Sequence, residues 1–116
     1  MQYMLLIHSD ETREATEDER NAIFGEYFAF SDAIRDQTES SAPLEPSSAT
    51  TTVRVRDGET LITDGPFAET KEQLGGFYLI DVETLDEALE IAARCPGAKH
   101  GTVEVRPLMP IPARQP

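Results

Sequence analysis

Two short segments of the chain, residues 2–8 and 77–82, are apolar at nearly every position. Successive side chains of a β-strand point to opposite faces of its sheet, so a strand of this composition has both faces buried. Both faces of the first segment are apolar, with Tyr3, Leu5 and Ile7 on one and Met4 and Leu6 on the other. The sequence therefore predicts two central strands in a sheet that must be covered on both sides.

Two amphipathic helices accompany these strands. Each begins with the spacing of a capping box, Thr16 with Glu19 and Thr84 with Glu87. We expect the first helix to run to about residue 36 and the second to end at Cys95. Their apolar stripes are Ile23, Tyr27, Phe30 and Ile34 in the first helix, and Leu85, Ala88, Leu89 and Ala92 in the second.

The remaining segments give the order of the elements. Asp57-Gly58 between the alternating runs 52–56 and 59–63 predicts a β-hairpin. Residues 38–51 are expected to form a loop or a weak edge strand, and residues 102–106 a last strand with one wet face. This order predicts an α+β fold, a ferredoxin-like split β-α-β sheet with an inserted β-hairpin.

The predicted parts do not cover the sheet completely. Two helices can cover only one of its faces, and the other face also carries apolar side chains. A second copy of the chain is the simplest cover, so we expect a homodimer with its sheets packed together. We expect a single domain over residues 1–108 and an extended tail over residues 109–116.

The composition excludes several classes of partner. The 116 residues carry 22 acidic against 10 basic side chains, a net charge of −12. No broad basic surface can form, which argues against nucleic acid and against anionic membranes. One cysteine, no basic segment at the start and no run of roughly 20 apolar residues together predict a soluble, cytoplasmic protein.

The common motifs for metals and cofactors are absent. The two histidines, His8 and His100, lie far apart in the sequence, with no His-x-x-x-His or Cys-x-x-Cys pair. There is no Walker loop, no Gly-x-Gly-x-x-Gly and no Gly-x-Ser-x-Gly. We therefore predict no metal and no cofactor.

The connector over residues 64–76 is the segment most suggestive of a site, because a structureless loop of this length usually has a function. Asp64 follows a strand and precedes Gly65-Pro66, so its carboxylate can project from the end of the sheet into a cleft. The structural alternative is an Asx-type hydrogen bond to its own turn, with Phe67 filling the core. Candidate polar contacts in the same loop are Glu69, Lys71 and Glu72.

Two further residues are candidates for a site. His100 precedes the last predicted strand, and histidine is the common side chain that titrates near neutral pH. Arg106 lies on the wet face of that strand, where it can orient a carboxylate ligand or pair with an acidic neighbour. A surface or capping role is the structural alternative for the histidine.

The connector and its flanks resemble a known family. Asp64 to Tyr78 reads DGPFAETKEQLGGFY, which resembles the signature of the DGPF branch of the YCII-related family. The resemblance extends to YMLLI at residues 3–7, TVRVRDG at 52–58 and VEVRP at 103–107. It implies a ferredoxin-like domain that forms a dimeric α/β barrel.

The resemblance implies less about function. The wider family is thought to include enzymes that use a His-Asp pair for acid–base chemistry, some acting on ring substrates by elimination. Members of the DGPF branch are often encoded beside extracytoplasmic-function sigma factors, which implies regulation instead. The family's proposed catalytic histidine lies on the first helix, but residues 17–36 here contain no histidine, so that residue cannot be transferred.

Two functions follow as hypotheses. In the first, the protein is an acid–base enzyme in which Asp64, with His100, exchanges a proton with a small polar or cyclic substrate in a cleft of the dimer. The residues expected to bind that substrate are Phe67, Glu69, Lys71 and Arg106. In the second, the protein is a non-catalytic dimeric module that binds a ligand or a protein partner associated with sigma-factor regulation.

Overall fold

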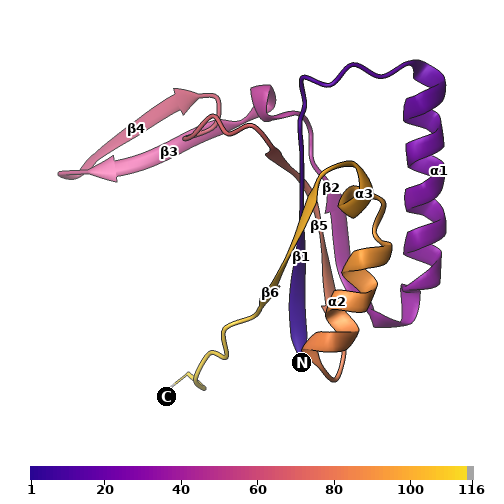
Figure 1. Ribbon diagram of the computed structural model, residues 1–116. Helices are drawn as coiled ribbons and strands as arrows, with labels where there is room; N and C mark the ends of the chain where they lie inside the picture. Colours follow the sequence, from indigo (N-terminus) through magenta and orange to yellow (C-terminus); the bar gives the residue numbers. More distant parts are fainter. Residues whose placement is uncertain (115–116) are drawn as a thin grey trace.

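The computed structural model describes residues 1–114, which form both helices and strands (Figure 1). The strands are β1 (Gln2–Ser9), β2 (Thr38–Pro43), β3 (Thr51–Arg56), β4 (Glu59–Asp64), β5 (Gln73–Asp81) and β6 (Thr102–Pro107). The α-helices are α1 (Glu17–Ala33), α2 (Leu85–Arg94) and α3 (Pro96–His100). Two short 3-10 turns are η1 (Arg35–Gln37) and η2 (Ser47–Ala49). None of these helices is long and apolar enough to cross a membrane.

The two doubly apolar segments form the centre of the main sheet. Its four strands lie in the order β2-β5-β1-β6, and every neighbouring pair is antiparallel. The prediction of two central strands is therefore confirmed, because β1 and β5 each have a neighbour on both sides. The β1–β5 register sets Tyr3 opposite Ile80 and shifts by one position between Ile7 and His8.

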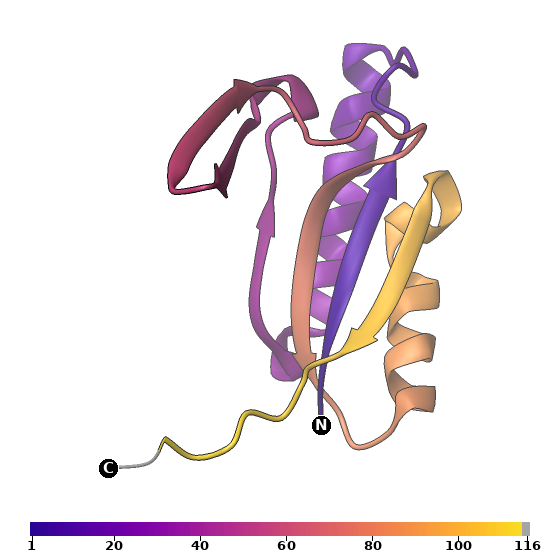
Figure 2. The same cartoon turned by 90° about the vertical axis from the view of Figure 1, so that its left-hand side faces the viewer.

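Helices α1 and α2 pack on the same face of this sheet (Figure 2). Side chains of β1 and β5 that point to this face form the core with residues of both helices. The fully buried side chains at its centre include Leu5, Ile34 and Ile80. Phe30 of α1 meets Tyr78 of β5 edge to face, with ring centroids 5.2 Å apart. Both predicted N-caps form, with Thr16 and Thr84 each accepting a hydrogen bond from the backbone three residues later. The glutamate half of each box differs, because Glu19 accepts from the Thr16 hydroxyl and Glu87 from the backbone N–H of Glu83.

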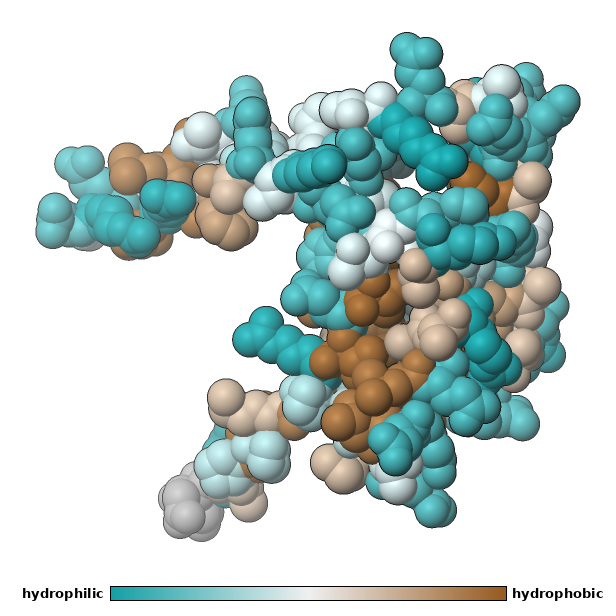
Figure 3. Space-filling model, viewed as in Figure 1, coloured by the Kyte–Doolittle hydropathy of each residue, from teal (hydrophilic) through white to brown (hydrophobic). Residues whose placement is uncertain are grey.

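The opposite face of the sheet has no helix on it. Its half-buried apolar side chains alternate with the core residues along β1 and β5: Met4, Leu6, Phe77 and Leu79. We call this surface the open face. The β3–β4 hairpin projects toward the same side, away from the helices (Figure 1). Its apolar side chains stand in solvent and are visible on the projecting arm in Figure 3.

The hairpin turn follows its sequence signal. Asp57 and Gly58 both have positive φ, 51° and 77°. Positive φ at both central residues is the type I′ geometry that matches the twist of the flanking strands, and Asp-Gly suits it because glycine carries no Cβ. Thr52 pairs with Thr63 and Arg56 with Glu59, close to the predicted strand limits.

The segment predicted as a loop or weak edge strand contains the edge strand β2, whose backbone pairs with β5 despite a polar sequence. Other local predictions need correction. The connector is shorter than predicted, since β5 already begins at Gln73. Helix α1 ends at Ala33 instead of residue 36, and Leu85 and Leu89 are about half exposed, with Ile91 buried in their place.

The segment after α2 was also predicted wrongly. The second helix does end at Arg94, but Pro96 opens a further short helix, α3, which was not predicted. Proline suits the first helical position because it has no N–H to leave unpaired. At the C-terminus, residues 108–114 form neither helix nor strand, and the last two residues of the predicted tail lie outside the described residues.

Candidate functional site

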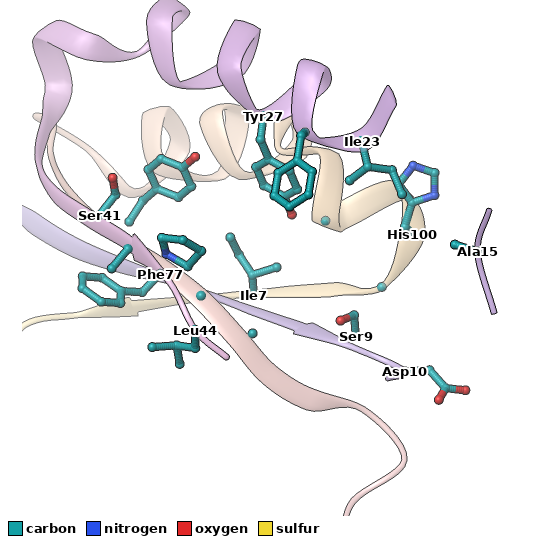
Figure 4. A pocket seen from close by; sticks show the side chains of 18 of the residues that line it. Ile7, Ser9, Asp10, Ala15, Ile23, Tyr27, Ser41, Leu44, Phe77 and His100 are labelled. Carbon is teal, nitrogen blue, oxygen red and sulfur yellow. The ribbon is translucent and has the colours of Figure 1, made fainter. Parts of the chain in front are cut away.

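A cavity of about 690 Å³ lies between α1 and the sheet (Figure 4). Four parts of the chain enclose it: the end of β1 with the segment after it, the face of α1 toward the sheet, the neighbouring ends of β2 and β5, and α3. Its walls are largely apolar, formed by side chains that include Ile7, Ile23, Phe24, Tyr27, Phe28 and Leu44. We call it the helix cavity. Its volume falls in the range of sites for small organic molecules, about 300–1,000 Å³.

Titratable side chains stand at one end of this cavity. His100, the last residue of α3, lines it and keeps about 31% of its side chain exposed. Its Nε2 lies 3.6 Å from Oε2 of Glu26, and Lys99 Nζ lies 3.4 Å from the other oxygen of the same carboxylate. Glu26 therefore sits between the imidazole and the ammonium group and ties α1 to α3.

Asp10 stands at the same end, just beyond β1 (Figure 4). Its Oδ1 accepts hydrogen bonds from both the backbone N–H and the hydroxyl of Thr12, at 2.9 and 2.6 Å. These hydrogen bonds, with a smaller contribution from the charge of Lys71, lower the pKa of Asp10 below its usual value. The helix cavity thus has an ionised carboxylate at its mouth at neutral pH.

Tyr27 forms part of the wall below α1 (Figure 4). Burial raises the pKa of its phenol well above the usual value, and the neighbouring Cys95 thiol adds to the shift. Burial also raises the pKa of Cys95 itself. The phenol therefore stays neutral at physiological pH and can donate a hydrogen bond without carrying charge.

Two glycines allow α3 and the strand after it to approach this site closely. A Cβ on Gly97 would lie 2.6 Å from Cγ2 of Ile7 and 2.8 Å from the Tyr27 hydroxyl. A Cβ on Gly101 would collide with the backbone carbonyl of His8. The absence of side chains at these two positions keeps His100 against the end of β1.

A second cavity, of about 590 Å³, lies beside the connector. Its lining comes from His8, from residues 44–50 and from the loop that starts at Pro66. We call it the loop cavity. Ile7 and Ser9 line the helix cavity while His8 lines the loop cavity, so the end of β1 is a wall shared by both.

Comparison with known proteins places the chain in a family. The model of the YCII-related domain matches residues 1–112, nearly the whole sequence. The chain belongs to the YCII-related family. An uncharacterised protein of Rhizobium meliloti (strain 1021) is 56% identical over 69 residues. That alignment covers 58% of this chain and 56% of the relative, so the match spans little more than half of either protein.

A solved structure is similar in fold to this YCII-related protein. It is the 5-chloro-2-hydroxyhydroquinone dehydrochlorinase TftG from Burkholderia phenoliruptrix AC1100, in complex with 2,5-dihydroxybenzoquinone. The TM-score is 0.54 with 94% of each chain covered, and the sequence identity is 14%. At that identity the similarity establishes the mixed α and antiparallel β fold alone.

The residues predicted for the site are spread over different places in this YCII-related protein. His100 lines the helix cavity and Phe67 lines the loop cavity. Asp64 ends β4 at the root of the hairpin and lines neither cavity of the single chain. Glu69 and Lys71 lie in the exposed loop before β5, and Arg106 is exposed on β6. Their roles stay predictions.

Two residues that line the helix cavity, Tyr27 and Asp10, and one that contacts His100, Glu26, were not identified from the sequence. Tyr27 was assigned to the core because it continues the apolar stripe of the first helix. Asp10 carried a usable signal, an acidic residue directly after a central strand. Glu26 carried none, because its contact with His100 depends on how α1 and α3 pack. Among residues 1–114, no cluster of three or more His, Cys, Asp or Glu side chains is arranged to hold a metal ion.

Proposed function

We propose that this protein is an acid–base enzyme that acts on a small cyclic substrate inside the helix cavity. The observation that carries the proposal is the combination of an apolar cavity of ligand size with a histidine at its end. Histidine is the side chain whose charge changes most readily near neutral pH, and proton transfer needs a group of that kind. The apolar walls exclude water and hold a ring.

The residues around His100 suggest a division of roles. The Glu26 carboxylate lies 3.6 Å from Nε2, where its charge attracts the imidazolium that forms on proton transfer. His100 accepts a proton from the substrate and returns it to the product or to its leaving group. Tyr27 donates a hydrogen bond to an oxygen on the ring, and Arg13, which also lines the cavity, attracts a negatively charged substituent.

The substrate class is proposed from cavity shape together with the related fold. A planar ring fits between aromatic side chains such as Phe24 and Phe28, which both line the cavity. TftG has the same fold and is a dehydrochlorinase solved with a dihydroxybenzoquinone. By analogy we propose a hydroxylated ring compound, with proton abstraction as the first step and elimination as the class of reaction.

Asp64 stays a proposed catalytic residue with a separate requirement. Because it lines neither cavity of one chain, it can take part only if a second copy brings it to the site or if the signature loop moves. The charge of Lys71 reaches Asp10, which supports a contribution of the same loop to binding at the mouth of the helix cavity. Glu69 and Arg106 are proposed as weaker contacts to polar substituents.

We also propose that two copies associate through the open face and form a dimeric α/β barrel. The sheet order, with both helices on one face, is what supports a ferredoxin-like classification. Leu79 lies on the open face of a central strand, so Leu79→Glu would place a charge in the interface. Light scattering should then report a change from dimer to monomer, and a wild-type monomer at micromolar concentration would refute the association.

A second candidate is a dimeric module that binds a partner in sigma-factor regulation. The observation in its favour is the projecting hairpin, where Val53, Val55, Leu61 and Ile62 are 45–68% exposed. An isolated two-stranded hairpin is at best marginally stable in water, so an exposed apolar arm suits a protein contact. Pull-down with a sigma factor, lost in Val53→Asp and retained in His100→Ala, would favour this function.

The acid–base proposal can be tested with 2,5-dihydroxybenzoquinone as the probe. The protein should bind it and accelerate exchange of its ring hydrogens with D₂O, followed by ¹H NMR. His100→Ala should reduce that acceleration about 100-fold or more, because positioned acid–base groups contribute about 10²–10⁴-fold. Lys99→Ala is the matched control, since Lys99 neighbours the same carboxylate but does not line the cavity.

Two results would contradict the proposal. One is wild-type protein that binds the probe without any acceleration of exchange. The other is a His100→Ala variant as active as Lys99→Ala. Asp64→Asn measured in the same assay decides whether Asp64 belongs to the catalytic machinery.

A further inference from the structure

The loop cavity is separate from the proposed acid–base site and is built largely by the signature segment. Pro66, Phe67, Thr70 and Glu72 of this segment line it. Residues from 44–52, His8 and the start of β5 complete the lining. The parts of the chain that enclose it come from three distant places in the sequence.

Hydrogen bonds between residues of the protein connect the segments that form this cavity. Thr52 Oγ1 donates to the carbonyl of Gly65 at 2.7 Å, which fixes the loop to the hairpin root. Gln73 Nε2 donates to the carbonyl of Thr70 at 3.0 Å. Ser47 donates from both its backbone N–H and its hydroxyl to the carboxylate of Glu11. The cavity is therefore a fixed shape rather than a gap between mobile loops.

The electrostatic character of the loop cavity is one-sided. No lysine or arginine lines it, whereas Glu45 and Glu72 both do. The charge of the whole chain, −12, adds a field that draws cations toward such a site and repels anions. A carboxylate or phosphate ligand would meet no positive partner here, so the cavity favours a cation.

His8 supplies a hydrogen-bonding group of the right kind. Its Nε2 lies 2.6 Å from Oε1 of Glu104 on the adjacent strand. This contact lacks the geometry of a hydrogen bond, so the buried Nε2 is without a hydrogen-bond partner among residues 1–114. The imidazole lines the loop cavity, where an imidazole nitrogen is a group that can take part in a hydrogen bond with a ligand.

Phe67 supplies the remaining element. It lines the loop cavity and yet is 79% exposed, an unusual state for a phenylalanine held beside a proline. The face of an aromatic ring attracts cations, and this attraction is used to recognise organic ammonium groups. The loop cavity is thus lined by an exposed aromatic ring, the Glu72 carboxylate and an imidazole. These groups together suit a cation with an apolar skeleton.

We infer that the loop cavity binds a small organic ammonium compound. In this arrangement the ammonium group lies near the Glu72 carboxylate and the His8 imidazole, and its carbon skeleton lies against Phe67. This site goes beyond the proposed acid–base function, because it shares no lining residue with the helix cavity except Leu44.

The test compares three probes of the same size and different charge: benzylammonium, benzyl alcohol and benzoate. Calorimetry on the full chain at low salt gives the affinities, and ¹H–¹⁵N NMR locates the perturbed backbone amides. We expect benzylammonium to bind at least five times more tightly than benzyl alcohol, and benzoate not to bind. The largest shifts should fall on residues 67–74 and on His8.

Variants then separate the contributions. Glu72→Gln should weaken benzylammonium binding about tenfold, because a charge-assisted contact is lost. Glu69→Gln is the matched control, since it removes the same charge from the same loop but does not line the cavity. Phe67→Ala should weaken binding by about three- to fivefold, in line with a partly exposed cation–π contact.

Each other outcome overturns the inference. Equal affinity for benzylammonium and benzyl alcohol would show that charge is not recognised. Equal losses in Glu72→Gln and Glu69→Gln would show only general attraction by the acidic surface. Shifts confined to the helix cavity would move the ligand to the other site. His100→Ala should leave benzylammonium binding unchanged, so failure here is distinguishable from failure of the acid–base proposal.

Discussion

Replacing Gly101 by alanine should destabilise the protein more than any other glycine substitution. Gly101 joins α3 to β6, and a Cβ there would collide with the carbonyl oxygen of His8, a backbone atom of a central strand. A backbone atom cannot rotate away as a side chain can. The strand β1 or the α3–β6 junction must therefore shift.

The size of the effect follows from that geometry. Forcing extra atoms into a packed interior costs about 1–3 kcal/mol, and a clash with backbone belongs at the upper end of that range. For a domain of about 116 residues, roughly 4 °C of melting temperature is lost for each kcal/mol, so Gly101→Ala should melt about 8–12 °C below the wild type. Circular dichroism during urea and thermal unfolding measures both quantities.

Gly25 provides the matched control. It lies inside α1, and a Cβ there would meet no atom within 4 Å. Gly25→Ala should therefore stabilise the protein by about 0.5–1 kcal/mol through helix propensity alone. Two results would refute the predicted clash between a Cβ on residue 101 and the carbonyl of His8. One is a fall of less than about 1 kcal/mol in the free energy of unfolding of Gly101→Ala, and the other is a change of stability in the same direction for both substitutions.

Three further predictions concern stability. Ile34→Ala should lower the free energy of unfolding by about 2–5 kcal/mol in urea titrations, because Ile34 is fully buried; a loss below 1 kcal/mol would contradict its place in the core. Thr84→Ala should cost about 1 kcal/mol by removing the α2 N-cap, and Thr84→Ser should restore most of it. Burial raises the pKa of Cys95 and Tyr27 above their ordinary values of 9.0 and 10.0. Both groups are neutral in the folded and the unfolded chain below about pH 9, so the free energy of unfolding keeps its full value there. At higher pH the unfolded chain ionises first, and the free energy of unfolding falls. Tyr27→Phe should flatten the alkaline fall in melting temperature, and an unchanged slope would refute its contribution.

The sequence predicted the parts of the fold that local chemistry determines. The apolar alternation of β1 and β5, the threonine caps of α1 and α2, and the Asp-Gly turn each depend on a few neighbouring residues, and each was correctly placed. The strand β2 has a polar, serine-rich sequence, so the sequence predicted it only as the alternative to a loop, and its pairing with β5 decides between the two. The short helix α3 depends on one proline after a helix end, a pattern that also fits a simple turn.

The site was harder to predict because its groups meet through packing. His100 could be selected for its chemistry, but its partner Glu26 comes from a helix 74 residues earlier in the chain and gives no local signal. In the signature loop, Phe67 and Glu72 line a cavity, and whether that cavity is a functional site stays a prediction. Which histidine lies in that cavity follows from the register of β1, where His8 and its neighbours point to opposite sides.

The β3–β4 hairpin leaves the body of the protein and returns to it at a single point. The N–H of Gly65 donates to the carbonyl of Thr50 at 2.7 Å, so the two ends of the arm are already hydrogen-bonded neighbours. Joining these two residues directly would leave all four strands of the main sheet in their order, but it would remove Thr52, which lines the loop cavity. The part of the arm beyond Thr52 and Thr63 is therefore an exchangeable appendage: its length and surface can be altered, or another peptide grafted in its place, while the residues that line the two cavities stay the same.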